Sequence, residues 1–263
     1  MHRSLIHFSH ANGFPAPAYA SMLDELGREH RVGFIPVIGE DARYPVTDGW
    51  PRLVDELIDA IERAHRGAPV IGVGHSLGGY LTFIAAARRP ELFRAIVLLD
   101  APIVGPVKGR LLAATKRFGI VDRVTPAGAT RDRRAHWDSR DEAKAHFRTR
   151  RLFGRFSEAC LDDYVRHGLV AASGGGYRLR IDPDLEYQIY RTMPDAMHRW
   201  LAQLRVPAGF VGGESSDVLR RVGLSMMRGA RFLKRRVPGG HLFPFEHPRA
   251  AAAAIGELVA ELG

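Results

Sequence analysis

Residues 70–79 read VIGVGHSLGG and place an apolar run directly before a serine that glycines flank. The run Val70–Gly74 is short and almost continuously hydrophobic, which is typical of a parallel strand covered on both faces. Leu77–Arg88 has a helix-forming composition and ends before Pro90, because a proline disfavours helical backbone in the residue that precedes it. We therefore expect a strand, a very tight turn at Ser76 and a helix.

The same alternation of short apolar runs and amphipathic stretches extends to both sides of this segment. It predicts a doubly wound, mostly parallel α/β sheet of about six strands, since strands and helices alternate with short connections. The other expected strands are Ser4–Phe8, Arg31–Pro36, Ala95–Leu99, Ala208–Gly212 and Phe232–Val237. The other expected helices are Ala18–Glu29, Pro51–Arg66, a stretch near Leu219–Met227, and Pro248–Glu261.

The alternation stops between Ile103 and Leu204, where helical stretches dominate and strand signals are few. The sequence SGGG at Ser173–Gly176 separates two short apolar runs and suggests a hairpin. We therefore divide the chain into an α/β core domain, residues 1–102 and 205–263, and an inserted, mainly helical lid, residues 103–204.

Ser76 lies at the centre of a Gly-x-Ser-x-Gly pattern, between a predicted strand and a predicted helix. Glycines two residues before and after it remove side chains that would collide as the strand folds back against the helix. Such a turn lifts the serine hydroxyl out of the sheet and aims free N–H groups of the helix start at the reaction centre. A glycine-rich turn without chemistry is the alternative, and the flanking strand and helix favour a nucleophile.

In this context the chain resembles the α/β-hydrolase superfamily. The resemblance rests on residues 74–79, on the loop His10–Pro15 (HANGFP) and on the Gly-Gly-His sequence that ends at His241. It implies a serine hydrolase with Ser76 as nucleophile and His241 as general base, in the chain order serine, acid, histidine. His247 competes as the base, but its place directly before Pro248 suits a helix cap better. The family often has two further antiparallel strands before the first strand seen here, so six strands are expected rather than eight.

The resemblance also implies an oxyanion hole made by two backbone amides, those of Phe14 and Leu77. Gly13 would permit the unusual backbone that aims the Phe14 N–H inward. Asn12 stands where the family usually has histidine, so its side chain is expected only to brace the loop. An ordinary surface turn is the other interpretation of this loop.

Three carboxylates compete for the acid that orients the base. Asp217 is our choice, because it lies in the loop GGESSD after the strand Ala208–Val211, where the family places its acid. Glu214 is nearer the strand end. Asp100 ends the strand after the nucleophile helix, a position that some relatives use.

These residues together predict cleavage of a carboxylic ester or related acyl compound through an acyl-enzyme intermediate, with no metal and no organic cofactor. Three alternatives stay open: a C–C bond hydrolase, a cofactor-free perhydrolase with the same triad, and a non-catalytic ligand receptor on the same fold. The partner is a small-molecule substrate whose choice depends on the lid.

The formal net charge of the 263-residue chain is +9, and most of it lies in the insert. Residues 103–204 hold 19 Lys and Arg against 12 Asp and Glu, a difference of +7. Attraction of an anionic substrate is one interpretation, and a solvated, arginine-rich surface is the other. No nucleic-acid-binding module accompanies the charge, so we expect no nucleic-acid partner.

The single cysteine, Cys160, cannot form an internal disulfide, and no Cys/His cluster has zinc-site spacing. We interpret it as a buried structural thiol in a helix at Ser157–His167. No apolar run approaches the roughly 20 residues that span a bilayer. Residues Met1–Ser9 lack the layout of a signal peptide. These features predict a soluble, cytoplasmic protein whose oligomeric state the sequence does not set.

Overall fold

The computed structural model describes residues 3–131, 133–228 and 232–263. Its main sheet has six strands, all parallel, in the order β2-β1-β3-β4-β8-β9. The predicted doubly wound sheet is therefore confirmed. Its strands are β1 (Leu5–Ser9), β2 (Arg31–Phe34), β3 (Val70–His75), β4 (Phe93–Leu99), β8 (Ala208–Gly213) and β9 (Phe232–Val237).

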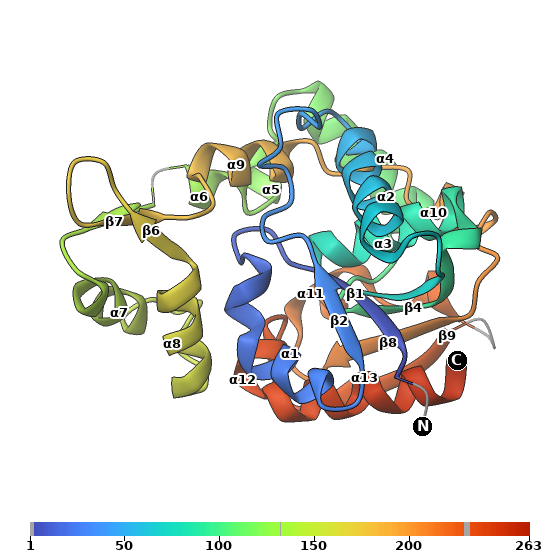
Figure 1. Cartoon of the computed structure of the whole chain (residues 1–263). Helices are drawn as coiled ribbons and strands as arrows, with labels where there is room; N and C mark the ends of the chain where they lie inside the picture. The colour runs from blue at the N-terminus through green and yellow to red at the C-terminus, as the bar shows by residue number, and fades with distance from the viewer. Residues whose placement is uncertain (1–2, 132, 229–231) are drawn as a thin grey trace.

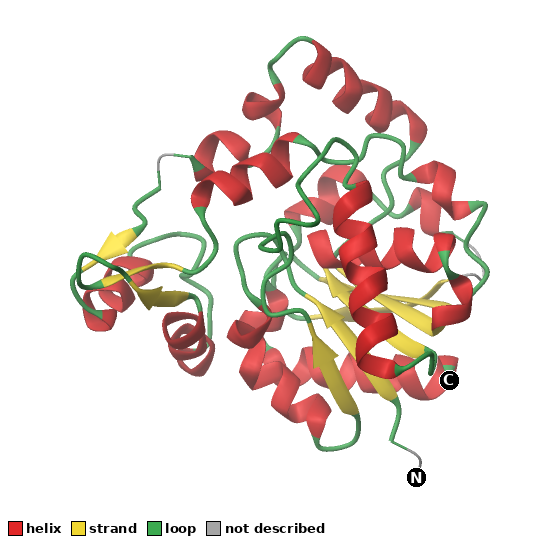
Figure 2. Ribbon diagram, turned by 45° about the horizontal axis from the view of Figure 1, so that its top comes forward, coloured by secondary structure: helices red, strands yellow, loops and turns green. Residues whose placement is uncertain are grey.

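Helices cover both faces of this sheet, because the side chains of each strand alternate between two hydrophobic clusters (Figure 2). On β4, for example, Val97 and Leu99 join the cluster formed with α1 (Ala20–Gly27) and α13 (Pro248–Leu262). Ile96 and Leu98 join the cluster formed with α2 (Pro51–His65) and α3 (Leu77–Arg88). Shorter helices lie at α11 (Asp217–Val222) and α12 (Phe243–Glu246), with 3-10 turns at Ala16–Tyr19, Pro90–Leu92 and Ser225–Met227.

The segment between β4 and β8 is mainly helical, as predicted, and lies beyond the carboxyl ends of the main strands and to one side of them (Figure 1). A small antiparallel sheet with the order β5-β7-β6 completes it. The expected hairpin around Ser173–Gly176 is confirmed, because Leu169 pairs with Leu179 across that turn. The elements are α4 (Pro106–Arg117), α5 (Val121–Val124), α6 (Ala127–Thr130), β5 (His136–Trp137), α7 (Arg140–Arg148), α8 (Glu158–His167), β6 (Leu169–Ala171), β7 (Tyr177–Leu179), α9 (Pro183–Arg191) and α10 (His198–Leu201).

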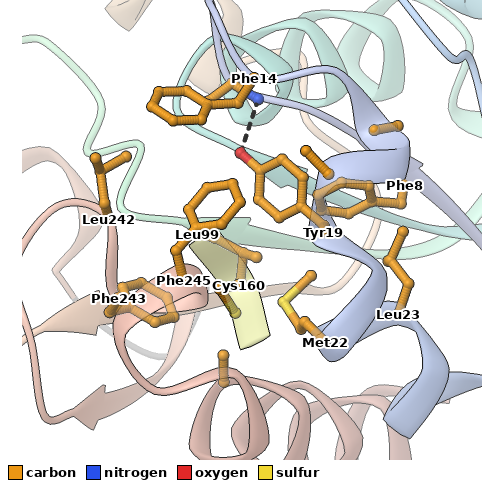
Figure 3. Packing of buried hydrophobic residues seen from close by; sticks show 14 of the residues in the cluster. Phe8, Phe14, Tyr19, Met22, Leu23, Leu99, Cys160, Leu242, Phe243 and Phe245 are labelled. Atoms are coloured by element: carbon orange, nitrogen blue, oxygen red, sulfur yellow. Dashed lines mark hydrogen bonds between the residues drawn. The ribbon is translucent and has the colours of Figure 1, made fainter. Parts of the chain in front are cut away.

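Aromatic side chains join this segment to the core. Figure 3 shows Tyr19 in the core cluster beside Phe8 and Phe245, at ring-centroid distances of 4.8 and 4.3 Å. From the insert, Phe156 stacks on Phe245 at 4.7 Å. Cys160 is buried in the same cluster, as expected, and burial raises the pKa of its thiol. Among the described residues, no helix is both long enough and apolar enough to cross a membrane.

Candidate active site

Ser76 occupies the sharp turn between β3 and α3 with φ 51° and ψ −112°. A positive φ in a non-glycine residue costs about 1–3 kcal/mol, so the surrounding structure must impose it. The glycines allow the close contacts that do so. A Cβ atom on Gly74 would lie 2.3 Å from the Gly78 carbonyl oxygen, and one on Gly78 would lie 2.1 Å from the Ser9 carbonyl oxygen. The tight turn therefore has the form that the sequence predicts.

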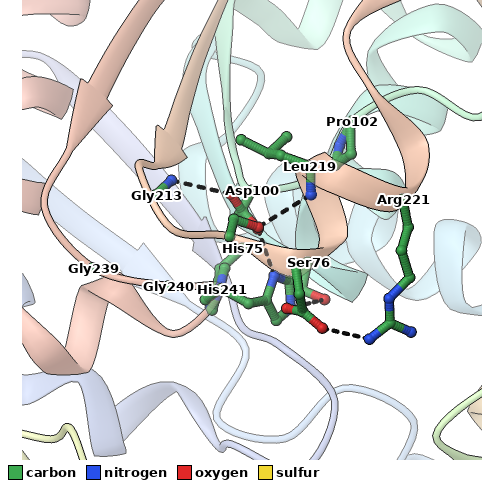
Figure 4. Close-up of polar contacts among 12 residues, drawn as sticks. His75, Ser76, Asp100, Pro102, Gly213, Leu219, Arg221, Gly239, Gly240 and His241 are labelled. Atoms are coloured by element: carbon green, nitrogen blue, oxygen red, sulfur yellow. Dashed lines mark hydrogen bonds and ion pairs between the residues drawn. The ribbon is translucent and has the colours of Figure 1, made fainter.

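Ser76, His241 and Asp100 form one hydrogen-bonded row (Figure 4). The His241 Nε2 atom lies 3.1 Å from the Ser76 Oγ atom, and His241 Nδ1 lies 2.7 Å from Asp100 Oδ2. Because a carboxylate only accepts hydrogen bonds, Nδ1 carries the proton and Nε2 is left to accept from the serine hydroxyl. This is the arrangement in which an imidazole can remove a proton from serine.

The carboxylate in this row is Asp100, which directly follows β4 and is 1% exposed. Its Oδ1 atom accepts the Gly213 N–H at 3.1 Å, and its Oδ2 atom accepts the Ser216 hydroxyl at 2.5 Å in addition to His241. Each carboxylate oxygen thus has a donor other than the base. These donors fix the orientation of the acid and stabilise its charged form.

The prediction that Asp217 contacts His241 is wrong. Asp217 is the first residue of α11, its side chain is 44% exposed, and it pairs with Arg221 at 2.5 Å. Glu214 is also exposed. The physical reason is the strand order: β8 lies directly beside β4, so the loop after β8 supplies Gly213 and Ser216 as supports for an acid that β4 carries.

The two expected oxyanion donors differ in their availability. The Leu77 amide lies in the first turn of α3, where backbone N–H groups have no intrahelical acceptor. No acceptor for it occurs among the described residues. The Phe14 amide instead donates to the Ala11 carbonyl at 3.2 Å, across the turn that Gly13 makes with φ 82°. The Phe14 amide thus has an acceptor within its own loop and the Leu77 amide has none among the described residues, and the oxyanion role of both stays a prediction.

Asn12 braces this loop, as expected, by donating its side-chain amide to the Glu186 carbonyl of α9 at 2.9 Å. His10 holds the loop from the other side, because its Nε2 accepts the Ile38 N–H at 2.8 Å. Burial lowers the pKa of His10 to about 4. A neutral ring is therefore built into the loop.

A second buried row, which the sequence did not predict, connects two loops of the candidate site through Tyr19 and His75. The Ala11 N–H donates to the Tyr19 hydroxyl at 3.2 Å, and Tyr19 donates to His75 Nδ1 at 2.7 Å. His75 Nε2 then donates to the His241 carbonyl at 2.9 Å. Burial lowers the pKa of His75 well below its usual value, so the ring is neutral and this direction of donation is the one it allows. The row fixes the His241 loop against the loop that carries Phe14.

An ion pair from the insert lies against the Gly13 turn. Arg133 Nη2 is 2.6 Å from Glu186 Oε2, and a Cβ atom on Gly13 would be 2.9 Å from Glu186 Oε1. Burial raises the pKa of Glu186, and Arg133 opposes that rise. The buried Glu186 carboxylate is therefore the group that contacts this loop, and the half-buried Arg133 is its charged partner.

Comparisons with known proteins agree with this geometry. Residues 8–255 match the sequence model of the alpha/beta hydrolase family. The abhydrolase domain-containing protein AFT2-1 of Alternaria alternata is 26% identical over 230 residues, which cover 73% of this chain and 83% of that protein. E-2-(acetamidomethylene)succinate hydrolase superposes with a TM-score of 0.79 at 19% identity, over 98% of this chain and 92% of that one. The thioesterase domain from the curacin biosynthetic pathway superposes with a TM-score of 0.72 at 16% identity, over 96% and 91% of the two chains.

Proposed function

The chain belongs to the alpha/beta hydrolase family, and on that premise we propose that it is a serine hydrolase that cleaves a carboxylic ester or related acyl compound. The observation that carries this proposal is the row Ser76–His241–Asp100, with distances of 3.1 and 2.7 Å. Serine, imidazole and carboxylate in this order are the groups that acyl transfer through an acyl-enzyme requires.

In the proposed reaction, Ser76 Oγ attacks the substrate carbonyl while His241 Nε2 accepts its proton. The protonated imidazole then gives that proton to the leaving group, and water cleaves the acyl-enzyme with His241 again as base. Asp100 stays ionised and stabilises the imidazolium that forms. Its two other hydrogen bonds, from Gly213 and Ser216, keep the charge in place during both steps.

We propose that the oxyanion accepts hydrogen bonds from the Leu77 and Phe14 amides. The Leu77 N–H has no acceptor among the described residues, whereas the Phe14 N–H already donates to the Ala11 carbonyl and would be shared with the oxyanion. A preorganised donor of this kind is worth about 3–4 kcal/mol to the transition state. Because the Phe14 amide already has an acceptor, we expect its share to be the smaller of the two.

Residues 103–204 are proposed to act as the lid over this site, because Glu186 of α9 contacts the oxyanion loop at Asn12 and Gly13. The substrate is proposed to be a small molecule, and the excess of 19 Lys and Arg over 12 Asp and Glu in residues 103–204 favours one that carries negative charge. The structurally similar E-2-(acetamidomethylene)succinate hydrolase is named for a succinate derivative, which agrees with an anionic substrate.

A fluorophosphonate probe tests the proposal, followed by mass spectrometry of the labelled peptide. We expect a single adduct on Ser76 and no adduct in Ser76→Ala. We also expect the enzyme to hydrolyse activated esters when it has not been treated with the probe. Absence of labelling in folded protein would favour the ligand-receptor alternative. Labelling without hydrolysis of any ester in a panel of acyl lengths would favour C–C bond or perhydrolase chemistry.

A further inference from the structure

An apolar surface runs along α4 and the turn that follows it. Of the seven large hydrophobic residues that are exposed in the described part of the chain, five lie between residues 107 and 124. We call these five the α4–α5 surface: Val107, Leu111, Phe118, Ile120 and Val124, with exposed fractions of 77, 65, 72, 40 and 54%. In a helical register, positions 107, 111 and 118 fall on one face, so the exposure is a continuous stripe and not a scatter.

The orientation of α4 is the reverse of that of an ordinary surface helix. Its buried residues are Gly109 and Thr115. A Cβ atom on Gly109 would lie 2.0 Å from the Asp195 carbonyl oxygen, so the small residue is needed where the helix meets the protein. Lys116, only 15% exposed, also faces inward and contacts Asp195 at 3.3 Å. Small and polar residues thus bind the helix to the protein, while its large apolar residues face outward.

Positive charge borders this stripe. Residues 106–124 contain five Lys and Arg against one Asp, a difference of +4. Arg110, Arg117 and Arg123 are exposed, and none of them has a carboxylate partner among the described residues. The one acid, Asp122, is already bound to Tyr187 at 2.8 Å and to Arg191 at 3.2 Å. The unneutralised guanidinium groups are therefore free to meet negative charge from outside the molecule.

We propose that the α4–α5 surface docks the protein on the anionic face of a phospholipid bilayer. An amphipathic helix with apolar residues on one side and arginine at the border lies in the plane of the interface, with its apolar face among the acyl chains. Arginine stems reach from that depth to the headgroup phosphates. A second copy of this chain suits the surface less well, because a two-fold contact would bring like-charged arginine rows together.

This docking does not depend on the proposed chemistry. The chain runs from the end of β4 to the start of α4 at Pro106 within a few residues, so the docked surface belongs to the proposed lid. Failure of the docking would leave the proposed hydrolase activity untouched, because in the described part of the chain the side chains of Ser76, His241 and Asp100 form no hydrogen bond with the α4–α5 surface.

Vesicle co-sedimentation of the full chain tests the proposal. The probes are phosphatidylcholine vesicles with and without about a fifth of phosphatidylserine. We expect at least about tenfold tighter binding to the anionic vesicles, and weakening by salt, because each juxtamembrane cation contributes to the attraction and is screened. The triple variant V107S/L111S/F118S should lose about tenfold or more of this binding, and R110E/R117E should remove the preference for phosphatidylserine.

Matched controls keep the result specific. Leu152→Ser and Phe34→Ser remove exposed apolar side chains elsewhere and should bind vesicles as the unaltered protein does. Unchanged ester hydrolysis in water and an unchanged circular dichroism spectrum show that each variant is folded. The proposal is overturned if the unaltered protein ignores anionic vesicles, if the triple variant binds as well as the unaltered protein, or if the controls weaken binding equally. It is also overturned if sedimentation shows a dimer that the triple variant abolishes, because the surface would then join two copies.

Discussion

Exchanging Asp100 for asparagine is the sharpest test of the proposed triad, since the two oxygens of Asp100 accept from different directions. Oδ2 serves His241 and the Ser216 hydroxyl, and Oδ1 serves the Gly213 N–H. An asparagine side chain has one acceptor and one donor end, so one of these directions must fail. Replacement preserves the size of the side chain and changes only charge and hydrogen bonding.

Both orientations of the amide are unfavourable. With its oxygen toward His241, the NH2 group faces the Gly213 N–H and leaves that buried donor unsatisfied, at a cost of about 1–3 kcal/mol. With its NH2 toward His241, the ring must accept at Nδ1 and carry its proton on Nε2, which then cannot take the proton of Ser76. We therefore expect kcat to fall by about ten-thousandfold, as in serine proteases whose triad acid becomes an amide.

The assay compares Asp100→Asn, Asp217→Asn and Glu214→Gln on one activated ester, after thermal unfolding shows that each is folded. Asp217 is half-exposed, and its one ion pair in the described part of the chain is with Arg221, so its loss should change kcat less than about threefold and stability by less than about 1 kcal/mol. Glu214→Gln should be equally mild. If Asp217→Asn is the crippled variant and Asp100→Asn is near normal, the reasoning from the hydrogen bonds is refuted.

Three further outcomes are expected. Ser76→Ala should remove nearly all turnover, by about a millionfold, while the protein stays folded; retention of a few per cent would exclude the serine as nucleophile. Tyr19→Phe should lower kcat about tenfold and stability by about 1–3 kcal/mol, because the buried Ala11 N–H loses its acceptor. The matched control is Tyr44→Phe, which removes a hydroxyl that donates to Asp59 of α2 and should spare kcat; equal effects on kcat would contradict the positioning role of Tyr19. Burial lowers the pKa of His10 to about 4, so below about pH 6.5 the unfolded chain binds the extra proton and the unfolding free energy should fall toward pH 4; calorimetry of His10→Gln should show a shallower fall.

The parts of the site that depend only on residues close together in the sequence could be predicted from it. The turn at Ser76 needs glycines at fixed offsets and a strand and helix on either side, and all of these are written within residues 70–88. The six parallel strands followed in the same way, because strands buried on both faces have continuous apolar runs. The hairpin at Ser173–Gly176 required only a glycine-rich turn between apolar segments.

The proposed acid, Asp100, could not be singled out from the sequence, because its place depends on which strands become neighbours. Asp100 and Gly213 are 113 positions apart and meet only because β4 and β8 pair. The position of Asp217 in the sequence was compatible with the triad, but its place as first residue of α11 directs its side chain to Arg221 and solvent. The one local signal that favoured Asp100 was its place at the carboxyl end of a central strand.

The hydrogen-bonded row through Tyr19 and His75, which joins the Ala11 loop to the His241 loop, could not be predicted from the sequence either. His75 was visible in the motif, yet its partners lie in the loops at residues 11–19 and at His241, which only the folded chain brings together. The Phe14 amide shows the converse case. The sequence located the loop correctly, but the acceptor of that amide depends on the backbone path that Gly13 gives the turn.

The pairing of β4 with β8 also bears on how such proteins diversify. The chain leaves the sheet after Leu99 and returns at Ala208, and Leu99 pairs with Val211 in adjacent strands, so both ends of the intervening segment are fastened side by side. The entropic cost of closing a loop grows only slowly with its length, so a longer or shorter segment between these two anchor points costs the rest of the molecule little. Ser76, Asp100 and His241 all lie outside residues 103–204. Because residues 103–204 are the proposed lid, we expect reaction chemistry and substrate choice to be inherited on separate stretches of the gene, and we expect a foreign stretch grafted between residues 103 and 204 to change the specificity.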